Sequence, residues 1–142
     1  MTKQEFLAMS LPYGLKCKDS DLLEPNKIYK YIGTFYQVDN ETGYEKVKPI
    51  LHPLTDLTKE IEHNGEKFTP YIELLRMSYF NVDDMTQDEL NDYKDAYSSN
   101  VDPMLIPFLD GLKLIEWHFD LFNGIESGEA IDVNTLDENP YK

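Results

Sequence analysis

The order of strand and helix signals along the chain limits the fold more than any other feature of the sequence. Residues 27–38 are rich in Ile, Tyr, Phe, Thr and Val, which favour a strand, and residues 44–51 have the pattern of the returning strand of a hairpin. Helix signals are concentrated between residues 69 and 127. Because strands and helices do not alternate, we predict an α+β domain in which a small, mainly antiparallel sheet from the N-terminal half packs against helices from the C-terminal half.

Capping and turn residues locate several shorter elements. In a capping box, a Ser or Thr side chain accepts a hydrogen bond from the helix backbone, and a Glu three residues later returns one. This spacing occurs at Thr2 and Glu5 and again at Thr86 and Glu89, so we predict that helices begin there. The pair Asn64-Gly65 favours a tight turn between two very short strands.

The C-terminal third has weaker signals. Asp102 precedes a proline and could begin a helix that Pro107 interrupts. Residues 113–119 have the composition of a buried helical segment, and residues 130–133 favour a final short strand.

The length and composition of the chain favour a single acidic domain over residues 1–142. With 41% of its residues hydrophobic, a chain of 142 residues can bury a core without disulfides. The tail, residues 137–142, is expected to be mobile, as chain ends commonly are.

The cysteine content and hydropathy of the chain favour a cytoplasmic protein. Cys17 is the only cysteine, so it cannot form an internal disulfide, and we expect it to be a small core residue. The most apolar run, residues 104–109, is far shorter than the roughly 20 residues that cross a bilayer. The N-terminus also lacks the apolar region of a secretory signal.

The charge of the chain is acidic and unevenly distributed. The net charge is −14, and residues 77–142 carry −12 of it, from 15 acids and three lysines. Proteins that bind nucleic acid need clustered Lys and Arg to neutralise phosphates, and Arg76 is the only arginine. We therefore exclude direct nucleic-acid binding and expect any partner of the acidic half to be a basic protein.

One acidic stripe on the helix expected after Thr86 is a candidate contact surface. Its four aspartates recur at helical spacing, roughly 6 Å apart, on the side opposite Leu90, Tyr93 and Tyr97. Such a stripe can dock a basic partner, and it can equally be a solvated helix face. The stripe consists of Asp84, Asp88, Asp92 and Asp95.

A second candidate site is the pair His118 and Asp120, two positions apart. A histidine beside a carboxylate can act as a general base or contribute to a metal site. The alternative is that His118 packs against the core and Asp120 caps a turn. His52 and His63 lie in separate segments without metal-ligand spacing, and the chain has no nucleophile elbow or phosphate loop. We therefore predict no metal and no cofactor.

Two blocks of the sequence carry a family resemblance. They are residues 48–54 with residues 56–61, and residues 117–120 with the segments 124–126 and 139–142. These blocks resemble a group of uncharacterised small proteins from prophages and other mobile elements of gut Bacteroidetes, whereas residues 73–110 match no part of that group. The group more often has Arg at the position of His52 and a second His at that of Trp117. The resemblance implies a genomic setting and no particular activity.

Together these features predict an accessory protein of a phage or mobile element. We expect it to act by protein–protein contact through its acidic surface. The alternative is a small hydrolase or metal-dependent enzyme that uses His118 and Asp120. A cleft with a third ligand beside His118 would favour the enzyme, whereas a buried His118 and an exposed acidic face would favour the binding protein.

Overall fold

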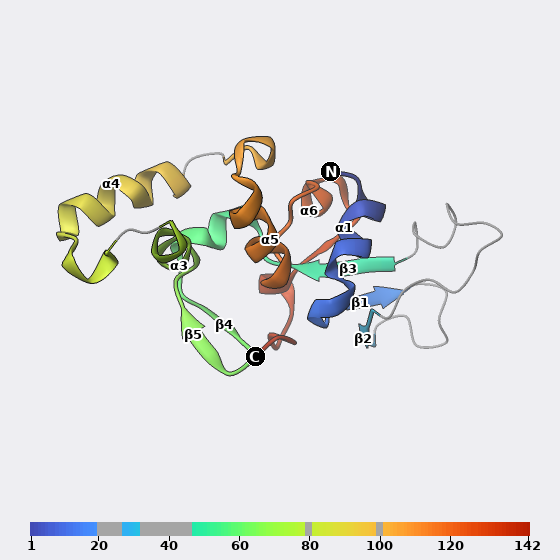
Figure 1. Cartoon of the computed structure of the whole chain (residues 1–142). Helices are drawn as coiled ribbons and strands as arrows, with labels where there is room; N and C mark the ends of the chain where they lie inside the picture. The colour runs from blue at the N-terminus through green and yellow to red at the C-terminus, as the bar shows by residue number, and fades with distance from the viewer. Residues whose placement is uncertain (20–26, 32–46, 79–80, 99–100) are drawn as a thin grey trace.

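The computed structural model describes residues 1–19, 27–31, 47–78, 81–98 and 101–142 (Figure 1). The strands are β1 (Lys16–Asp19), β2 (Tyr29–Lys30), β3 (Val47–Leu51), β4 (Ile61–His63), β5 (Glu66–Phe68) and β6 (Ile131–Asp132). The α-helices are α1 (Lys3–Ser10), α3 (Pro70–Met77), α4 (Gln87–Ser98), α5 (Phe108–Glu116) and α6 (Gly124–Ser127). The short 3-10 turns are η1 (Leu11–Tyr13), η2 (Leu54–Thr58), η3 (Val82–Asp84), η4 (Pro103–Leu105) and η5 (Val133–Thr135).

The central sheet has four strands in the order β2-β1-β3-β6. Strand β1 pairs antiparallel with β2 and with β3, whereas β6 joins β3 in parallel, with Ile50 opposite Ile131. The prediction of an α+β fold is confirmed, and the sheet is mixed because one strand comes from the C-terminal end. Of the predicted strand 27–38, residues 29–30 are strand, while residues 32–38 lie outside the described residues, as does the expected start of the returning strand at 44–46.

The predicted turn at Asn64-Gly65 joins the separate hairpin of β4 and β5. Both turn residues have positive φ, 51° for Asn64 and 83° for Gly65, which these two residue types tolerate best. The hairpin packs on the rest of the molecule through Phe68, whose ring centroid lies 4.8 Å from that of Trp117. The local sequence signal for this hairpin is therefore confirmed.

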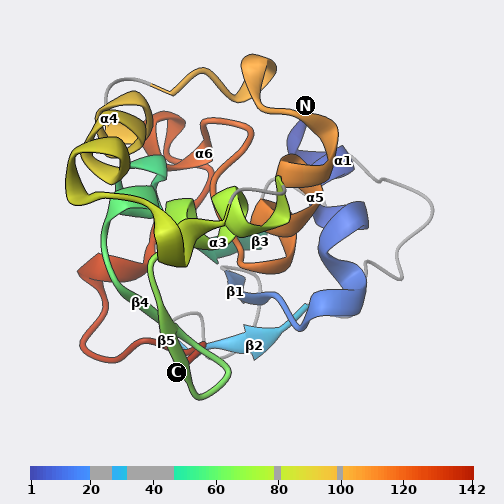
Figure 2. The same ribbon diagram turned by 60° about the vertical axis from the view of Figure 1, so that its left-hand side comes forward.

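Two groups of helices occupy different parts of the molecule (Figures 1 and 2). Helices α1 and α5 contact each other and bury Phe6, Leu7 and Leu114 in the main core with β1 and β3. Helices α3 and α4 contact each other and η2, and α4 extends away from the sheet in Figure 1. The sheet is thus covered by α1 together with α5, and α3 reaches the same core through Leu74.

The two faces of β3 enter two different apolar clusters. Leu51 belongs to the main core, whereas its neighbour Ile50 packs with Val133 and Tyr141 in a smaller cluster. Successive strand residues point to opposite faces, so both faces of β3 are covered. The C-terminal segment, which contributes Val133 and Tyr141, covers the face of β3 that carries Ile50.

The C-terminal tail is anchored, which corrects the prediction that residues 137–142 are mobile. Tyr141 is only 3% exposed, and its Oη donates to the carbonyl of Ile50 at 2.7 Å and accepts from the N–H of Lys16 at 2.9 Å. Asn139 donates from Nδ2 to the carbonyl of Glu62 at 2.9 Å. A buried ring and hydrogen bonds to three other segments hold this end of the chain in place.

Two smaller expectations concern the thiol and the apolar segments. Cys17 is buried in the main core on β1, as a small apolar residue would be. Across the described parts of the chain, none of the helices has both the length and the apolar character needed to cross a bilayer.

Candidate functional site

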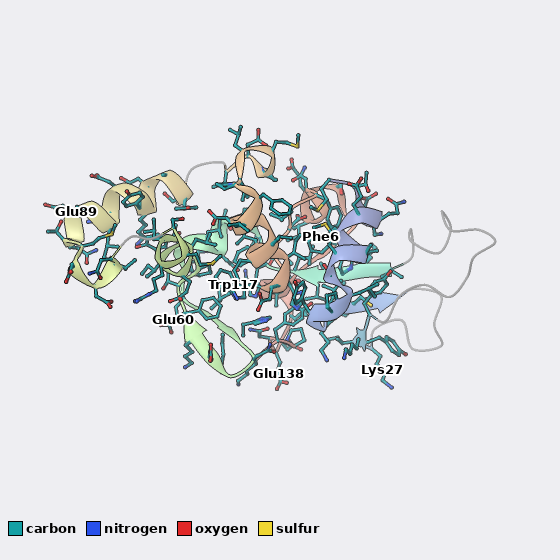
Figure 3. The ribbon with its side chains drawn as sticks, viewed as in Figure 1. Phe6, Lys27, Glu60, Glu89, Trp117 and Glu138 are labelled. Atoms are coloured by element: carbon teal, nitrogen blue, oxygen red, sulfur yellow. The ribbon has the colours of Figure 1, made fainter. Side chains whose placement is uncertain are left out.

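Helix α4 carries the predicted acidic stripe on its outer side. The backbone N–H of Glu89 donates to Oγ1 of Thr86 at 3.2 Å, so the predicted cap is present. The opposite side of the helix, with Leu90 and Tyr93, packs with the cluster of Tyr71 from α3. Figure 3 shows Glu89 at the outer end of the helix, far from the interior.

Three of the four predicted aspartates share the α4 surface. Asp88, Asp92 and Asp95 are exposed and lie within the helix at i, i+4 and i+7. Asp84 is also exposed, but it belongs to η3, before the helix begins, and accepts a hydrogen bond from Nδ2 of Asn81. The continuous four-residue spacing along one helix is therefore wrong at its first member, because the chain turns between Asp84 and the helix start.

Next to α4, the chain exposes four large apolar side chains. They lie in η4 and the first turn of α5, and we call them the apolar ridge. Each is between 68% and 81% exposed. Contiguous groups of large apolar side chains on a protein surface commonly mark binding sites. The ridge consists of Met104, Leu105, Phe108 and Leu109.

The backbone of the ridge follows signals visible in the sequence. The carboxylate of Asp102 accepts from the N–H of Met104 at 2.9 Å and begins η4, as predicted. Pro107 then separates η4 from α5. No pattern in the sequence indicates that residues 104–109 are exposed, because their exposure depends on how η4 packs.

Two largely apolar pockets flank the ridge. One, of about 260 Å³, lies between α1 and α5 and is lined by residues such as Met9, Phe108 and Leu112. The other, of about 300 Å³, lies between the end of α4, η4 and α5; we call it the α4–α5 pocket. Its wall includes Tyr97, and two carboxylates, Asp102 and Asp110, also line it. The ridge and both pockets adjoin one another around η4 and the start of α5, and the α4–α5 pocket reaches the end of α4 at Ala96 and Tyr97.

Asp120 has a structural role. Its Oδ1 accepts from the N–H of Gly124 at 2.8 Å and its Oδ2 accepts from the N–H of Ile125 at 2.9 Å. Both oxygens of the buried carboxylate are thus used to begin α6. The interpretation of Asp120 as a residue that caps a turn is supported by these contacts.

His118 lies inside the molecule and is 0% exposed. Its backbone has a left-handed φ of 61°, and its carbonyl accepts from the N–H of His52 at 2.8 Å. The carbonyl of His52 in turn accepts from the N–H of Asp120 at 2.9 Å. The segment around His118 therefore continues the parallel pairing at the end of β3, which sequence reasoning did not anticipate.

All three histidines of the chain gather around Tyr141, although they are distant in sequence. The ring centroid of Tyr141 lies 4.3 Å from that of His118, 5.8 Å from that of His63 and 6.4 Å from that of His52. His63 and His118 are 5.3 Å apart. We call these four residues the histidine cluster. The topology of β3, β4 and the C-terminal segment brings them together, and no spacing in the sequence indicates it.

Several nitrogen atoms of the histidine cluster have no hydrogen-bond partner within the described residues. They are Nε2 of His52, Nδ1 of His63 and both ring nitrogens of His118. Burial, helped by the nearby His63 and His52, lowers the pKa of His118 to about 3, against a small opposing effect of the Tyr13 carbonyl. Burial likewise lowers the pKa of His63. His118 and His63 are therefore neutral at physiological pH.

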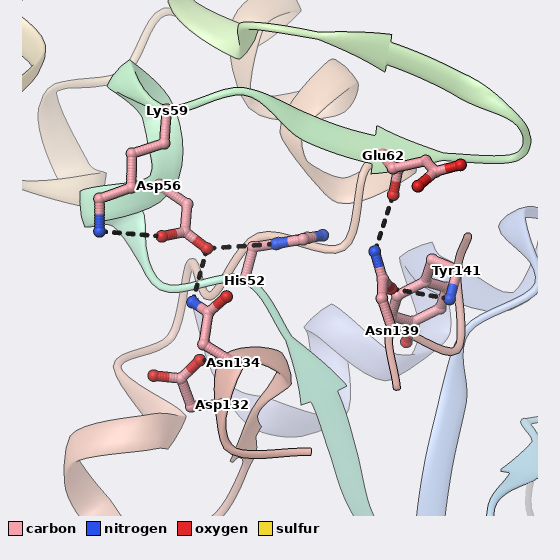
Figure 4. A network of polar contacts seen from close by, with 8 residues as sticks. All are labelled: His52, Asp56, Lys59, Glu62, Asp132, Asn134, Asn139 and Tyr141. Atoms are coloured by element: carbon pink, nitrogen blue, oxygen red, sulfur yellow. Dashed lines mark hydrogen bonds and ion pairs between the residues drawn. The ribbon is translucent and has the colours of Figure 1, made fainter. Parts of the chain in front are cut away.

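A polar network borders the histidine cluster on one side (Figure 4). Asp56 accepts from Nδ2 of Asn134 at 2.8 Å and faces Nδ1 of His52 at 3.4 Å and Nζ of Lys59 at 3.6 Å. Burial opposes ionisation of Asp56, but His52, Asn134 and Lys59 outweigh it and lower its pKa. The network orients His52 toward the interior.

The arrangement does not form a metal site. In the regions that the structure describes, no group of three or more His, Cys, Asp or Glu side chains is placed to hold a metal ion. Ring contacts between His118, His63 and Tyr141 account for how these side chains pack.

No family model, curated protein or solved structure matches the chain. The molecule itself offers two candidate regions. One is the exposed acidic and apolar region around α4 and α5, and the other is the buried histidine cluster. Only the first has side chains that a macromolecular partner can reach.

Proposed function

We propose that this protein is a binding module that captures a basic protein partner on the surface formed by α4, the apolar ridge and α5. The observation that carries this proposal is the adjacency of exposed apolar side chains and an acidic helix. Leu105 and Phe108 are 81% and 75% exposed, beside a helix that carries Asp92 and Asp95 on its outer side. From its sequence resemblance, we place the module among the accessory proteins of phages and mobile elements.

The two components of the surface have different physical roles. Large apolar side chains that become buried on association supply most of the affinity at an interface. Acidic side chains around them accelerate the encounter with a basic partner and reject acidic ones. Because residues 77–142 carry a net charge of −12, self-association through this face is opposed by repulsion. A basic partner can bury the apolar side chains of this face without such repulsion.

The alternative, a small hydrolase or metal-dependent enzyme, has less support. It requires His118 and Asp120 to face a substrate, yet His118 is 0% exposed and both oxygens of Asp120 bind backbone N–H groups. A general base has to come within hydrogen-bond reach of its substrate. The geometry therefore favours the binding module.

The test compares capture from a host lysate by the full chain and by two variants. The first variant neutralises Asp88, Asp92 and Asp95 by substitution with Asn, and the second replaces Leu105 and Phe108 with Ser. We expect wild type to retain a defined set of basic proteins at low salt, and both variants to lose it. Screening of exposed charges beyond about 8 Å at physiological ionic strength should also weaken wild-type capture as salt rises.

A matched control removes the same charge elsewhere. Glu129→Gln, Asp137→Asn and Glu138→Gln change three exposed acids of the C-terminal segment and should leave capture unchanged. If the α4 variant retrieves the same proteins with the same salt response as wild type, the acidic helix is a solvated face and the proposal is wrong.

A further inference from the structure

The α4–α5 pocket combines an apolar wall with two acidic residues, of which one is buried. Its volume is about 300 Å³, and most of its lining is apolar, including Leu57, Leu74, Val101 and Leu114. The carboxylates of Asp102 and Asp110 lie in the same lining. The side chain of Asp102 is exposed to solvent, and its Oδ1 already accepts a hydrogen bond from the backbone N–H of Met104.

Asp110 differs because it is covered and unpaired. Only 7% of its surface is exposed, although it lies near the surface of the molecule, and it makes no hydrogen bond or ion pair with any part of the chain that the structure describes. Burial of an ionised carboxylate without a partner is unfavourable. The same burial raises the pKa of Asp110. Such a group is stabilised when a cation binds beside it.

None of the cations on the neighbouring described elements, which include Lys94 on α4, forms an ion pair with Asp110. Lys113, on the same helix, pairs with Glu116 at 2.9 Å and lies over the ring of Trp117. Arg76 on α3 pairs with Glu73 and with Asp83. The carboxylate of Asp110, in the first turn of α5, is therefore available to a cation of a partner.

The remaining wall favours a particular kind of cation. The half-buried ring of Tyr97 lines the pocket, and burial together with the charge of Asp110 raises the pKa of its hydroxyl, so the phenol stays neutral. An aromatic ring and a carboxylate attract the same positive charge. The apolar residues contact the alkyl stem that bears it.

We propose that the α4–α5 pocket accepts the side chain of a lysine of the basic partner, with its ammonium on Asp110 and its alkyl stem against the apolar wall. This inference rests on the proposed function, since it names the group that the surface would receive. A lysine matches the pocket because its alkyl stem can lie against the apolar wall while its compact ammonium reaches the carboxylate of Asp110. The pocket thereby adds specificity to a surface that otherwise selects by charge.

The direct test uses a small probe, n-butylammonium, with the full-length protein labelled with nitrogen-15. We expect titration near neutral pH to shift the backbone amides around Ala96 and Tyr97 and around Leu105 to Asp110. 1-Butanol has a similar stem but no charge, so it should bind at least about tenfold more weakly, as expected for the loss of a hydrogen bond to a charged group. Binding of the cation should also lower the pKa of Asp110, which is measured on carbon-13-labelled protein from the chemical shift of its carboxyl carbon.

Two variants make the test specific to the carboxylate. Asp110→Asn should remove the preference for n-butylammonium over 1-butanol, while Asp88→Asn, on the exposed side of α4, should retain it. Thermal unfolding checks that both variants are folded. Equal binding of the two probes by wild type, or an unchanged preference in Asp110→Asn, would overturn the inference.

The failure of this inference can be told apart from failure of the proposed function. If n-butylammonium binds at Asp110 but lysate capture does not depend on the α4 acids or the ridge, the lysine pocket is supported and the proposed function is wrong. If capture depends on both the α4 acids and the ridge but n-butylammonium does not bind, the proposed function is supported and the lysine pocket is wrong.

Discussion

The surface around α4 and α5 and the histidine cluster both contain groups without partners, but with opposite physical meanings. On the surface, the apolar ridge and Asp110 are within reach of another molecule, so their unsatisfied state indicates a binding site. In the interior, the ring nitrogens of His118 are beyond the reach of any macromolecule. Their unsatisfied state instead makes the folded protein sensitive to protons. An unpaired group that a partner can reach is evidence of a binding site, whereas an unpaired group in the interior lowers the stability of the folded protein when it is protonated.

The largest expected difference between the two regions comes from deletion of an aromatic ring. Tyr141→Ala removes a buried ring and its hydrogen bonds to Ile50 and Lys16, and should lower the free energy of unfolding by about 3–5 kcal/mol. Phe108→Ala removes a ring that is 75% exposed and should change it by less than about 0.5 kcal/mol. Urea unfolding near neutral pH measures both. Similar losses in the two variants would show that the ridge is part of the packed core.

Acidification should destabilise the protein through the histidine cluster. Because the pKa of His118 is about 3 in the folded state and 6.5 ordinarily, the unfolded chain binds a proton that the folded protein excludes. Its contribution to stability is complete above about pH 6.5 and is lost as pH falls toward 3, at up to about 1.4 kcal/mol per pH unit. Urea unfolding between about pH 7 and pH 4.5 measures the slope.

The control for this prediction is a variant without the titrating ring. His118→Phe should lower the stability at neutral pH only moderately and should flatten the pH dependence, although His63 retains a smaller contribution of the same sign. Asp110 acts in the opposite direction, because its raised pKa makes the folded state gain stability as its carboxyl group is protonated. A slope unaffected by His118→Phe would mean that other groups control acid unfolding.

Asp120 provides a test that is intermediate in size. Asp120→Ala leaves the N–H groups of Gly124 and Ile125 without their acceptors in a buried region and should lower the free energy of unfolding by about 2 kcal/mol. Asp132→Ala removes a similar bond to the exposed N–H of Asn134 and should lose about half as much. Thermal and urea unfolding compare the two. A fully stable Asp120→Ala variant would reopen the possibility of a functional role for this carboxylate.

The smallest expected effect on stability is that of the acidic helix. Replacing Asp88, Asp92 and Asp95 with Asn relieves repulsion between neighbours but removes the favourable interaction of Asp88 with the N-terminus of α4. These two effects oppose each other, and Asp95 also loses an interaction that it makes within the protein, so the free energy of unfolding should fall by less than about 1 kcal/mol. A much larger loss, measured by urea unfolding, would mean that these residues have structural contacts and would invalidate their use as a pure test of binding.

The sequence was informative where structure depends on neighbours along the chain. The caps at Thr2 and Thr86 and the turn at Asn64-Gly65 are set by local hydrogen bonds and backbone conformation, and each is present. The anchoring of Tyr141 and the convergence of the histidines on it depend on pairing between segments far apart in the chain, which local patterns do not encode. The exposure of the ridge likewise depends on tertiary packing.

The bonds between Tyr141 and Lys16 also bear on how the protein acquires its structure. They join positions separated by 125 residues, and the parallel pair of Ile50 with Ile131 spans 81 residues. Contacts at such separation form slowly, because the entropy of closing the loop opposes them until many have formed together. Helices α3 and α4, which contact mainly each other and η2, can form through nearer neighbours. We therefore expect refolding to begin around these helices and to end with docking of the C-terminal segment, which a probe of Tyr141 fluorescence or hydrogen exchange would register last.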